Sequence, residues 1–410
     1  MMSRCQVALG IAASLLLGLC AKGGELPKLV GDGVVDDTAA IQARLDSGAP
    51  LVYLPPPAKH YLISKPLRVG SGQELRLDRF TLVRLAPGSN CAMLENRNWR
   101  EGDRQVAIVG GIWDMANAKQ APNPIQTKGQ AIPNEYQRDF FMGICFRFDR
   151  VSGLTIRDLT IMNPVTFSIQ LCRVDHFLVE GITFDFQTWN PIRLNMDGIH
   201  LDGGCHHGRV ANLRGTCFDD MVALNANDGA DSPYQGEISD IDIDGIYAEY
   251  CHSAVRMLST GAPVRRVTIS NVHGHFYVYT VGFTHYFPGR PRGIFEDIHL
   301  ENIFTAKALS PADIGVHSRA SYPVIQFQGP IDCGTVTIRN LSRVESTLPT
   351  TTIGIEPAAT VRHLTLDGIT LNNQLKTPIP VLTGRDRVKT LVHRNIELLP
   401  STNAYTHLLP

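Results

Sequence analysis

The chain has 410 residues, 43% of them hydrophobic, and a formal net charge of −1. A chain of this length can bury a large core, but length alone leaves the number of domains open. The near-neutral charge provides no basic surface for nucleic acid, so we expect no nucleic-acid partner. A local cluster of basic residues could still bind an acidic polymer without changing the total charge.

The first residues are typical of a secretory signal peptide. Arg4 supplies a positive charge, and the apolar run from Val7 to Leu19 is too short to span a bilayer. We expect residues 1–23 to be a signal peptide and the mature protein, residues 24–410, to be secreted or periplasmic. Leu19 is too bulky for the position before a lipidated cysteine, so no lipid anchor is expected at Cys20. No later segment has the roughly 18 consecutive apolar residues of a membrane helix.

Seven cysteines follow the signal segment, and their spacing matches no zinc motif. In a chain of this length most should be small apolar core residues, although a bridge between Cys205 and Cys217 stays an alternative in an exported protein. Two further features are weak metal signals. Adjacent side chains such as His206 and His207 rarely face one ion, and the segment from Asn225 to Asp231 lacks the full ligand set of a calcium loop. We therefore expect no metal and no cofactor.

The mature chain opens with features of a short helix and a strand. Asp36 or Asp37 can cap a helix with Ala40, Ile41 and Leu45 on one face, ending near Gly48. Leu51–Leu54, followed by three prolines, predicts a short strand with a sharp exit. A helix in this place would cover the open edge of a first β-coil.

A short phrase then recurs along the chain: two alternating apolar residues, a polar residue, an Asn, Asp or Gly, and another apolar residue. The third residues of its nine copies are Ile156, Val179, Val210, Ile243, Ile269, Leu300, Ile338, Leu366 and His393, at intervals of 23 to 38. Period-2 alternation of Val, Ile and Leu indicates strands, and the Asn, Asp or Gly indicates a turn with an unusual backbone conformation. Repeats with variable insertions indicate a solenoid.

Among solenoids and repeat folds, a right-handed parallel β-helix fits the pattern best. Leucine-rich repeats are excluded by the longer, irregular period, and a β-propeller needs four strands in each repeat of about 40–50 residues. We predict an all-β protein with one β-helix domain over residues 24–410 and a short N-terminal capping helix, and we expect a monomer.

Three carboxylates, those of Asp197, Asp219 and Asp220, lie at a spacing close to one turn of this repeat. Asp197 precedes Asp219 by 22 residues, so the two should lie on neighbouring coils. Asp219 and Asp220 would point to opposite sides of a regular strand, so we expect a bend that brings both to solvent. Crowding should raise the pKa of one carboxyl group, which would provide an acid and a base at one pH. The alternative is that these residues form turns or hold calcium.

The segments Asn195-Met196-Asp197-Gly198 and Asp219-Asp220 resemble motifs of glycoside hydrolase family 28, the polygalacturonases and rhamnogalacturonases. Residues 31–42, Gly-Asp-Gly-x-x-Asp-Asp-Thr-x-Ala-Ile-Gln, are similar to an N-terminal motif of pectate-lyase-like β-helix proteins. The resemblance implies hydrolysis with inversion. In that mechanism Asp219 would protonate the glycosidic oxygen, and Asp197 and Asp220 would deprotonate the attacking water.

Two motifs of the family are altered in this chain. Cys251-His252-Ser253 replaces Gly-His-Gly, and Arg256-Met257-Leu258 replaces Arg-Ile-Lys, whose cations contact a substrate carboxylate. We expect His252 and Arg256 to bind substrate, together with Arg193 and Asn195 beside Asp197. The missing Lys makes galacturonate recognition doubtful.

The sequence therefore predicts a secreted inverting glycoside hydrolase acting on a polysaccharide or oligosaccharide. Two alternatives stay open on the same fold. One is a polysaccharide lyase or uronate epimerase, and the other is a non-catalytic carbohydrate-binding β-helix.

Overall fold

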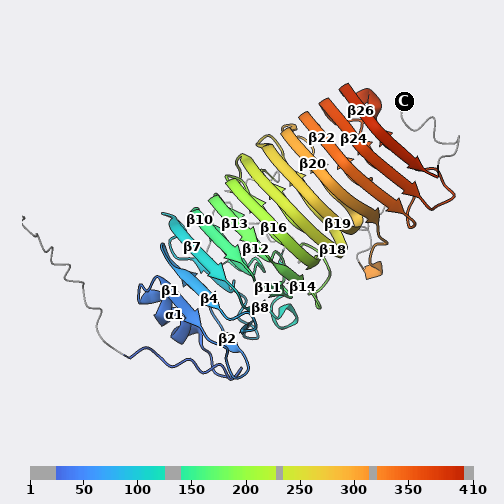
Figure 1. The fold of residues 1–410 in the computed structure, drawn as a ribbon. Coiled ribbons are helices and arrows are strands. Elements are labelled where there is room, and N and C mark those ends of the chain that lie inside the picture. The colour runs from blue at the N-terminus through green and yellow to red at the C-terminus, as the bar shows by residue number, and fades with distance from the viewer. Residues whose placement is uncertain (1–24, 125–139, 228–233, 314–320, 401–410) are drawn as a thin grey trace, which may run out of the picture.

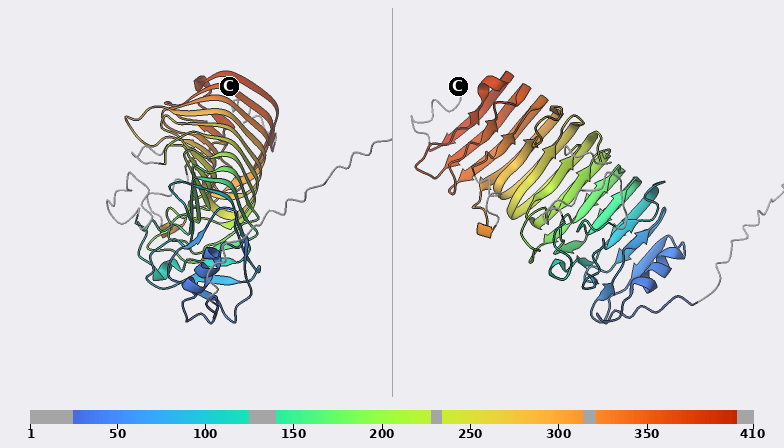
Figure 2. Two further views of the ribbon diagram at one scale, coloured as in Figure 1. Left: turned by 90° about the vertical axis from the view of Figure 1, so that its left-hand side faces the viewer. Right: turned by 180° about the vertical axis from the view of Figure 1, so that it is seen from behind.

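The computed structural model describes residues 25–124, 140–227, 234–313 and 321–400. Within these ranges the chain winds into an elongated stack of coils (Figures 1 and 2). The named strands pair in parallel throughout, as Ile156 does with Val179 on the next coil. The predicted right-handed parallel β-helix is confirmed. The predicted signal peptide, residues 1–23, lies outside the described residues.

The N-terminal part of the stack is built from short strands. They are β1 (Leu51–Leu54), β2 (Tyr61–Ile63), β3 (Leu67–Val69), β4 (Glu74–Leu77), β5 (Leu82–Leu85), β6 (Leu94–Asn96), β7 (Asp103–Val109), β8 (Ile112–Asp114), β9 (Phe146–Asp149), β10 (Val151–Arg157), β11 (Thr160–Met162), β12 (Ile169–Cys172), β13 (Asp175–Glu180), β14 (Thr183–Asp185) and β15 (Ile199–Asp202). A 3-10 turn, η1 (Asn117–Lys119), follows β8.

Further along, single strands bend around two or three sides of a coil. The remaining strands are β16 (His206–Thr216), β17 (Asp220–Asn225), β18 (Ile238–Leu258), β19 (Pro263–Thr284), β20 (Gly293–Lys307), β21 (Ile325–Phe327), β22 (Ile331–Glu345), β23 (Ile353–Ile355), β24 (Thr360–Asn373), β25 (Leu382–Thr383) and β26 (Val388–Leu399). A second 3-10 turn, η3 (Arg385–Arg387), lies between β25 and β26.

The strands form three rows that run the length of the stack. One row passes through β1, β4, β7, β10, β13 and β16 and continues to β26, and a second begins with β2, β5 and β8. The third row passes through β9, β12, β15 and β17 and then the last parts of β18 and β19. This third row carries the carboxylates discussed below.

The nine repeated phrases stack directly on one another. Ile156, Val179 and Val210 are register partners on successive coils, and the chain of partners continues without a break to His393. The Asn, Asp or Gly two residues later has a positive φ in every copy, between 52° and 85°. Those residue types adopt this left-handed conformation more readily than others, so they set the corner of each coil.

Some of the corner residues also bond to one another along the stack. The Asn302 amide donates to Asn271 Oδ1 at 3.1 Å and accepts from Asn340 Nδ2 at 3.1 Å. Each side chain in such a ladder satisfies its neighbour, which holds successive corners in register.

The helix α1 (Thr38–Asp46) lies at the N-terminal end of the stack (Figure 1). Its Ile41 and Leu45 are fully buried in the core, as the apolar pattern predicted. Asp37 precedes the helix, but its carboxylate accepts from the Val30 and Gly31 N–H groups and makes no cap bond to the helix. The predicted capping helix is confirmed.

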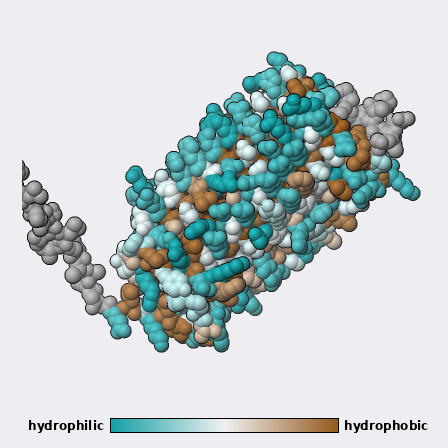
Figure 3. All heavy atoms as spheres, viewed as in Figure 1, coloured by the Kyte–Doolittle hydropathy of each residue, from teal (hydrophilic) through white to brown (hydrophobic). Residues whose placement is uncertain are grey.

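Most of the buried apolar residues of the described coils form one continuous core cluster, and Tyr277, Val278, Tyr279 and Ala308 form a second, smaller one. On the face seen in Figure 3, hydrophilic residues predominate, with hydrophobic ones scattered among them. Cys205 and Cys217 are both buried free thiols, so the alternative of a bridge between them is wrong. Among the described residues, none of the helices has the length and apolar character needed to cross a membrane.

Candidate active site

The three carboxylates lie at the start of β15 and β17, on the third row of strands. β15 and β17 pair with an offset of 23 residues, as in Ile199 with Val222, and the Gly198 N–H donates to the Asp220 carbonyl at 2.9 Å. Continuing this register by two residues places Asp197 beside Asp220. Asp197 and Asp219 lie on neighbouring coils, as the spacing of 22 residues predicted, but the residue in register with Asp197 is Asp220.

Asp220 is fully buried and has a complete set of partners. Ser253 Oγ and Arg256 Nε donate to its two oxygens, and His252 Nδ1 lies 3.6 Å from Oδ1. Burial alone would raise the pKa of Asp220, but the Arg256 charge and the contacts with His252 and Ser253 hold it well below its usual range. The expectation that Asp220 reaches solvent is therefore wrong. The buried charge is stable because partners on the next coil replace the water.

Asp219 points to the outside and is the most accessible of the three carboxylates. Its side chain is 19% exposed, whereas the side chain of Asp220 is 0% exposed. The backbone N–H of Asn195 donates to Asp219 Oδ2 at 3.1 Å, and His252 Nδ1 lies 3.5 Å from Oδ1. Asn195 has a φ of 56°, and this left-handed turn aims its N–H at the carboxylate. Asp219 is thus held in place while one edge stays open to a ligand.

Asp197 is buried, and only one of its oxygens has a partner. His200 Nδ1 lies 2.6 Å from Oδ2, while Oδ1 has no hydrogen-bond partner. Burial and the nearby charge of Asp219 raise the pKa of Asp197 to about 7, against the opposing effect of His200. The expectation that one carboxyl of the cluster has a raised pKa is confirmed.

His200 joins this carboxyl to a second acidic group. Its Nε2 lies 3.4 Å from Asp202 Oδ1. Burial lowers the pKa of His200, but the charge of Asp202 and the hydrogen bond to Asp197 raise it to about 10. The ring of Phe167 stacks on the imidazole with centroids 3.9 Å apart. His200 is therefore a cation near neutral pH, placed between two carboxyl groups.

Asn225 also contacts this imidazole. Its Nδ2 lies 2.8 Å from His200 Nε2, and its Oδ1 is buried without a partner. Turning the amide over would let Oδ1 accept a hydrogen bond from a protonated Nε2 and would satisfy the orphaned oxygen. His200, Asp202 and Asn225 were not predicted from the sequence. The alternation Ile199-His200-Leu201-Asp202 contained the signal, because it places both polar residues on one side of the strand.

Of the four residues predicted to bind substrate, three lie directly at the carboxylates. They are His252, Arg256 and Asn195, with the contacts given above. Arg256 is 13% exposed, and its guanidinium is engaged by Asp220. Arg193 lies to one side, where it covers the Trp189 ring at 3.7 Å and forms an ion pair with Asp313 at 3.2 Å.

Asp219, Asp220 and His252 also have the spacing of a cation site, because one ligand atom of each lies within 4.8 Å of the others. Arg256 already provides Asp220 with a positive partner. The charge that a metal would supply to Asp220 is therefore present in the protein itself.

A groove of about 1100 Å³ runs beside this site over β14, β16, β18 and β19. Its lining includes Arg214, Tyr247 and His273, and none of the three clustered carboxylates contributes to it. Two other carboxyl groups, those of Asp185 and Glu249, do line the groove. The cluster is the candidate reaction site because its three carboxyl groups lie together in different environments, as acid/base chemistry requires.

No model of a protein family and no curated protein sequence matches the chain. Solved structures do match. An exopolygalacturonase from Thermotoga maritima has a TM-score of 0.61 at 15% identity, covering 90% of this chain and 89% of that one. The A-module of a mannuronan C-5 epimerase from Azotobacter vinelandii has a TM-score of 0.58 at 12% identity, covering 91% of this chain and 98% of that one. A surface adhesin of Streptococcus pneumoniae has a TM-score of 0.54 at 12% identity, covering 90% and 89%. These similarities show that the protein has the fold of the pectate-lyase-like right-handed β-helix proteins.

Proposed function

We propose that the protein is a glycoside hydrolase that cleaves a polysaccharide or oligosaccharide with inversion of configuration. The observation that carries this proposal is the divergent environment of three clustered carboxyl groups. Burial and the charge of Asp219 raise the pKa of Asp197 to about 7, the Arg256 charge lowers the pKa of Asp220, and Asp219 is open to a ligand. Carboxyl groups in such different environments can take different roles at one pH. The similarity to exopolygalacturonases supports the same interpretation.

In the proposed reaction, Asp219 donates a proton to the glycosidic oxygen as the bond from that oxygen to the anomeric carbon breaks. A water molecule attacks the anomeric carbon from the opposite side and loses its proton to the ionised form of Asp197, beside the buried carboxylate of Asp220. Asp219 is the acid in this scheme because it is the carboxyl with an edge open to substrate. The cation His200 would hold Asp197 in place and stabilise its ionised form.

The raised pKa of Asp197 makes its role testable by pH. If Asp197 is the base, kcat/KM should increase as the pH rises through about 7, because the ionised form becomes available. A profile that falls through the same range would assign the acid role to Asp197 and contradict the scheme.

The site favours a substrate whose binding does not depend on a carboxylate. Arg256 already neutralises Asp220, and the Lys of the Arg-Ile-Lys motif is replaced by Leu258. A substrate panel should therefore include neutral as well as uronate-containing polysaccharides. The predicted secretion of the protein fits an extracellular polymer.

Product analysis over this panel tests the proposal and separates it from its alternatives. Hydrolysis releases reducing ends without ultraviolet absorbance, a lyase creates an absorbing double bond, and an epimerase releases neither. The first-formed product should have the inverted anomeric configuration by proton NMR. A retained configuration, an unsaturated product or binding without cleavage would contradict the proposal.

A further inference from the structure

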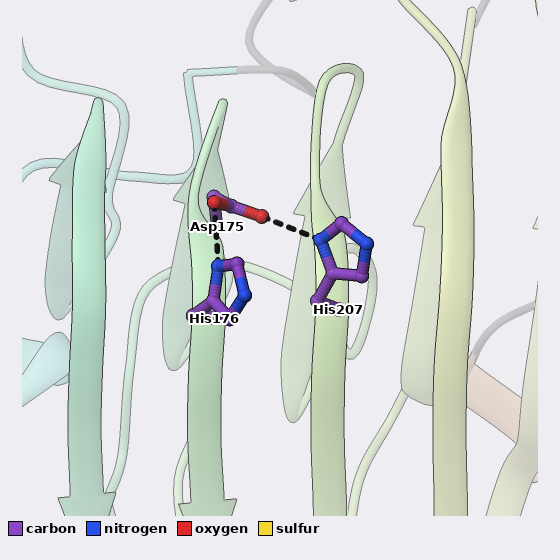
Figure 4. Close-up of side chains that lie close together, drawn as sticks. All are labelled: Asp175, His176 and His207. Carbon is purple, nitrogen blue, oxygen red and sulfur yellow. Dashed lines mark hydrogen bonds and ion pairs between the residues drawn. The ribbon is translucent and has the colours of Figure 1, made fainter.

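A second cluster of side chains lies at the corner between the third and first rows of strands. Asp175 and His176 start β13, and His207 lies one residue into β16 on the next coil (Figure 4). Asp175 Oδ2 lies 2.6 Å from His176 Nδ1, and its Oδ1 lies 2.8 Å from His207 Nδ1. One carboxylate therefore joins two imidazoles from successive coils.

The coil register produces this arrangement. Asp175 is paired with His206, so the following residues, His176 and His207, are stacked. Their ring centroids lie 4.8 Å apart with an interplanar angle of 27°. Both residues have a positive φ, 54° and 52°, which turns their side chains to the same outer side. His206 behaves differently, because its Nδ1 lies 2.9 Å from Ser239 Oγ on the following coil.

We propose that Asp175, His176 and His207 form a binding site for a divalent transition-metal ion of the kind that prefers imidazole, such as Zn²⁺. One ligand atom of each residue lies within 4.8 Å of the others. Two imidazoles and one carboxylate, with open positions for water, are a ligand set that suits zinc, copper or nickel. The side chains of Asp175, His176 and His207 are 40%, 67% and 55% exposed, so an ion can enter from solvent.

The hydrogen-bonded form needs little adjustment to accept an ion. Zinc bonds of about 2.0–2.2 Å place tetrahedral ligand atoms roughly 3.3–3.6 Å apart, so the carboxylate oxygens and the Nδ1 atoms, now at hydrogen-bond distance, would move apart by up to about 1 Å. Burial raises the pKa of Asp175, but the hydrogen bonds from His207 and His176 outweigh it, so the carboxylate is ionised as a ligand must be.

The cluster is open to solvent and has a further acidic residue beside it. Asp240 Oδ2 lies 3.9 Å from His207 Nε2, and Asp240 itself is bound by Arg266 at 2.6 Å and 2.7 Å. Asp240 is therefore better placed as a nearby negative charge than as a direct ligand. A bound ion would link β13 to β16 and clamp two coils together.

Calorimetric titration of the untagged protein with Zn²⁺ tests the site. We expect one saturable site in the unmodified protein and at least about tenfold weaker binding in each of His176→Ala and His207→Ala. His206→Ala is the matched control, since it removes an adjacent imidazole outside the cluster, and it should bind normally. Zn²⁺ should raise the unfolding temperature of the unmodified protein and of His206→Ala but not of the double variant His176→Ala/His207→Ala.

Three results would overturn the proposal. They are the absence of saturable binding to the unmodified protein, unchanged binding to the double variant, and loss of binding in His252→Ala instead. Circular dichroism of the variants without metal shows whether each is folded, so a weakened titration can be assigned to the missing ligand. The same variants should keep the proposed hydrolytic activity, which separates this test from the proposed function.

Discussion

His200 Nδ1 lies 2.6 Å from Oδ2 of Asp197, three residues earlier in the chain, and pairs this buried acid with a cation. The other side of the imidazole faces Asp202 at 3.4 Å. Because His200 keeps Asp202 as a partner when Asp197 is neutral, Asp197 can gain and lose a proton near neutral pH without leaving the imidazolium unpaired. The pairing with His200 therefore leaves Asp197 as the group of the site that can titrate near neutral pH.

The stability of the protein should therefore report the proton on Asp197. Its pKa is about 7 in the folded protein, above the ordinary value of 3.8, so between these values the folded state holds a proton that the unfolded chain has lost. The stabilisation that this proton provides is present below about pH 4 and is lost as the pH rises through about 7. Asp197→Asn lacks this dependence. Between about pH 4 and pH 8, the unfolding free energy of this variant should therefore rise relative to that of the unmodified protein by up to a few kcal/mol.

Urea unfolding at a series of pH values measures this difference. His200 contributes mainly at higher pH, since its stabilisation is lost as the pH rises from its ordinary value of 6.5 through about 10. A variant that loses stability relative to the unmodified protein as the pH rises through 7 would show that Asp197 is stabilised as an anion, contrary to our account.

Arg256 should prove to be a structural partner of Asp220 as well as a neighbour of substrate. Arg256→Gln leaves a fully buried carboxylate without its cation, and breaking such a pair costs about 3–5 kcal/mol. The double variant Asp220→Asn/Arg256→Gln should recover most of this loss, because the uncompensated charge is removed with its partner. Chemical unfolding of the two variants measures the coupling. A loss below about 1 kcal/mol in Arg256→Gln would favour a guanidinium devoted to substrate.

The corner ladder offers a test of the fold that does not involve the site. Asn302→Gly keeps the positive φ of 57° but loses hydrogen bonds to Asn271 and Asn340, so we expect a cost of about 1–2 kcal/mol. Asn302→Ala loses the same bonds and also places a Cβ in the left-handed region, which adds about 1–2 kcal/mol. The unfolding temperature should therefore be highest for the unmodified protein, lower for Asn302→Gly and lowest for Asn302→Ala. Equal stability of the two variants would show that the corner conformation costs nothing at this position.

The repeat could be predicted from the sequence because it depends on local features of the chain. Alternating apolar residues and a corner residue such as Asn271 follow from strand geometry and backbone sterics, and they predicted nine stacked strands correctly. The arrangement of the site was harder to predict from the sequence because it depends on which residues meet across coils. A difference of one residue in register pairs Asp197 with Asp220, and loops of unequal length bring Ser253 and Arg256 to the same carboxylate.

Burial was also hard to predict for the charged residues. The expectation that Asp220 needs solvent ignored the partners that the next coil provides. His200 was overlooked because it lies outside the motifs that carried the resemblance, although its place in an alternating strand marked it as outward-facing. The aspartates from Asp228 to Asp231, a weak calcium signal in the sequence, lie outside the described residues.

The most direct test of the proposed function is the release of reducing ends by the unmodified protein and by Asp219→Asn on the substrate panel. Replacing an aspartate by asparagine preserves the shape of the side chain, so Asp197→Asn serves as a companion and Asn302→Gly as a control outside the site. We predict that Asp219→Asn lowers kcat by about 10²–10⁴, the usual contribution of a general acid, while its unfolding temperature stays close to that of the unmodified protein. Hydrolysis by Asp219→Asn at the unmodified rate would contradict the assignment of this site.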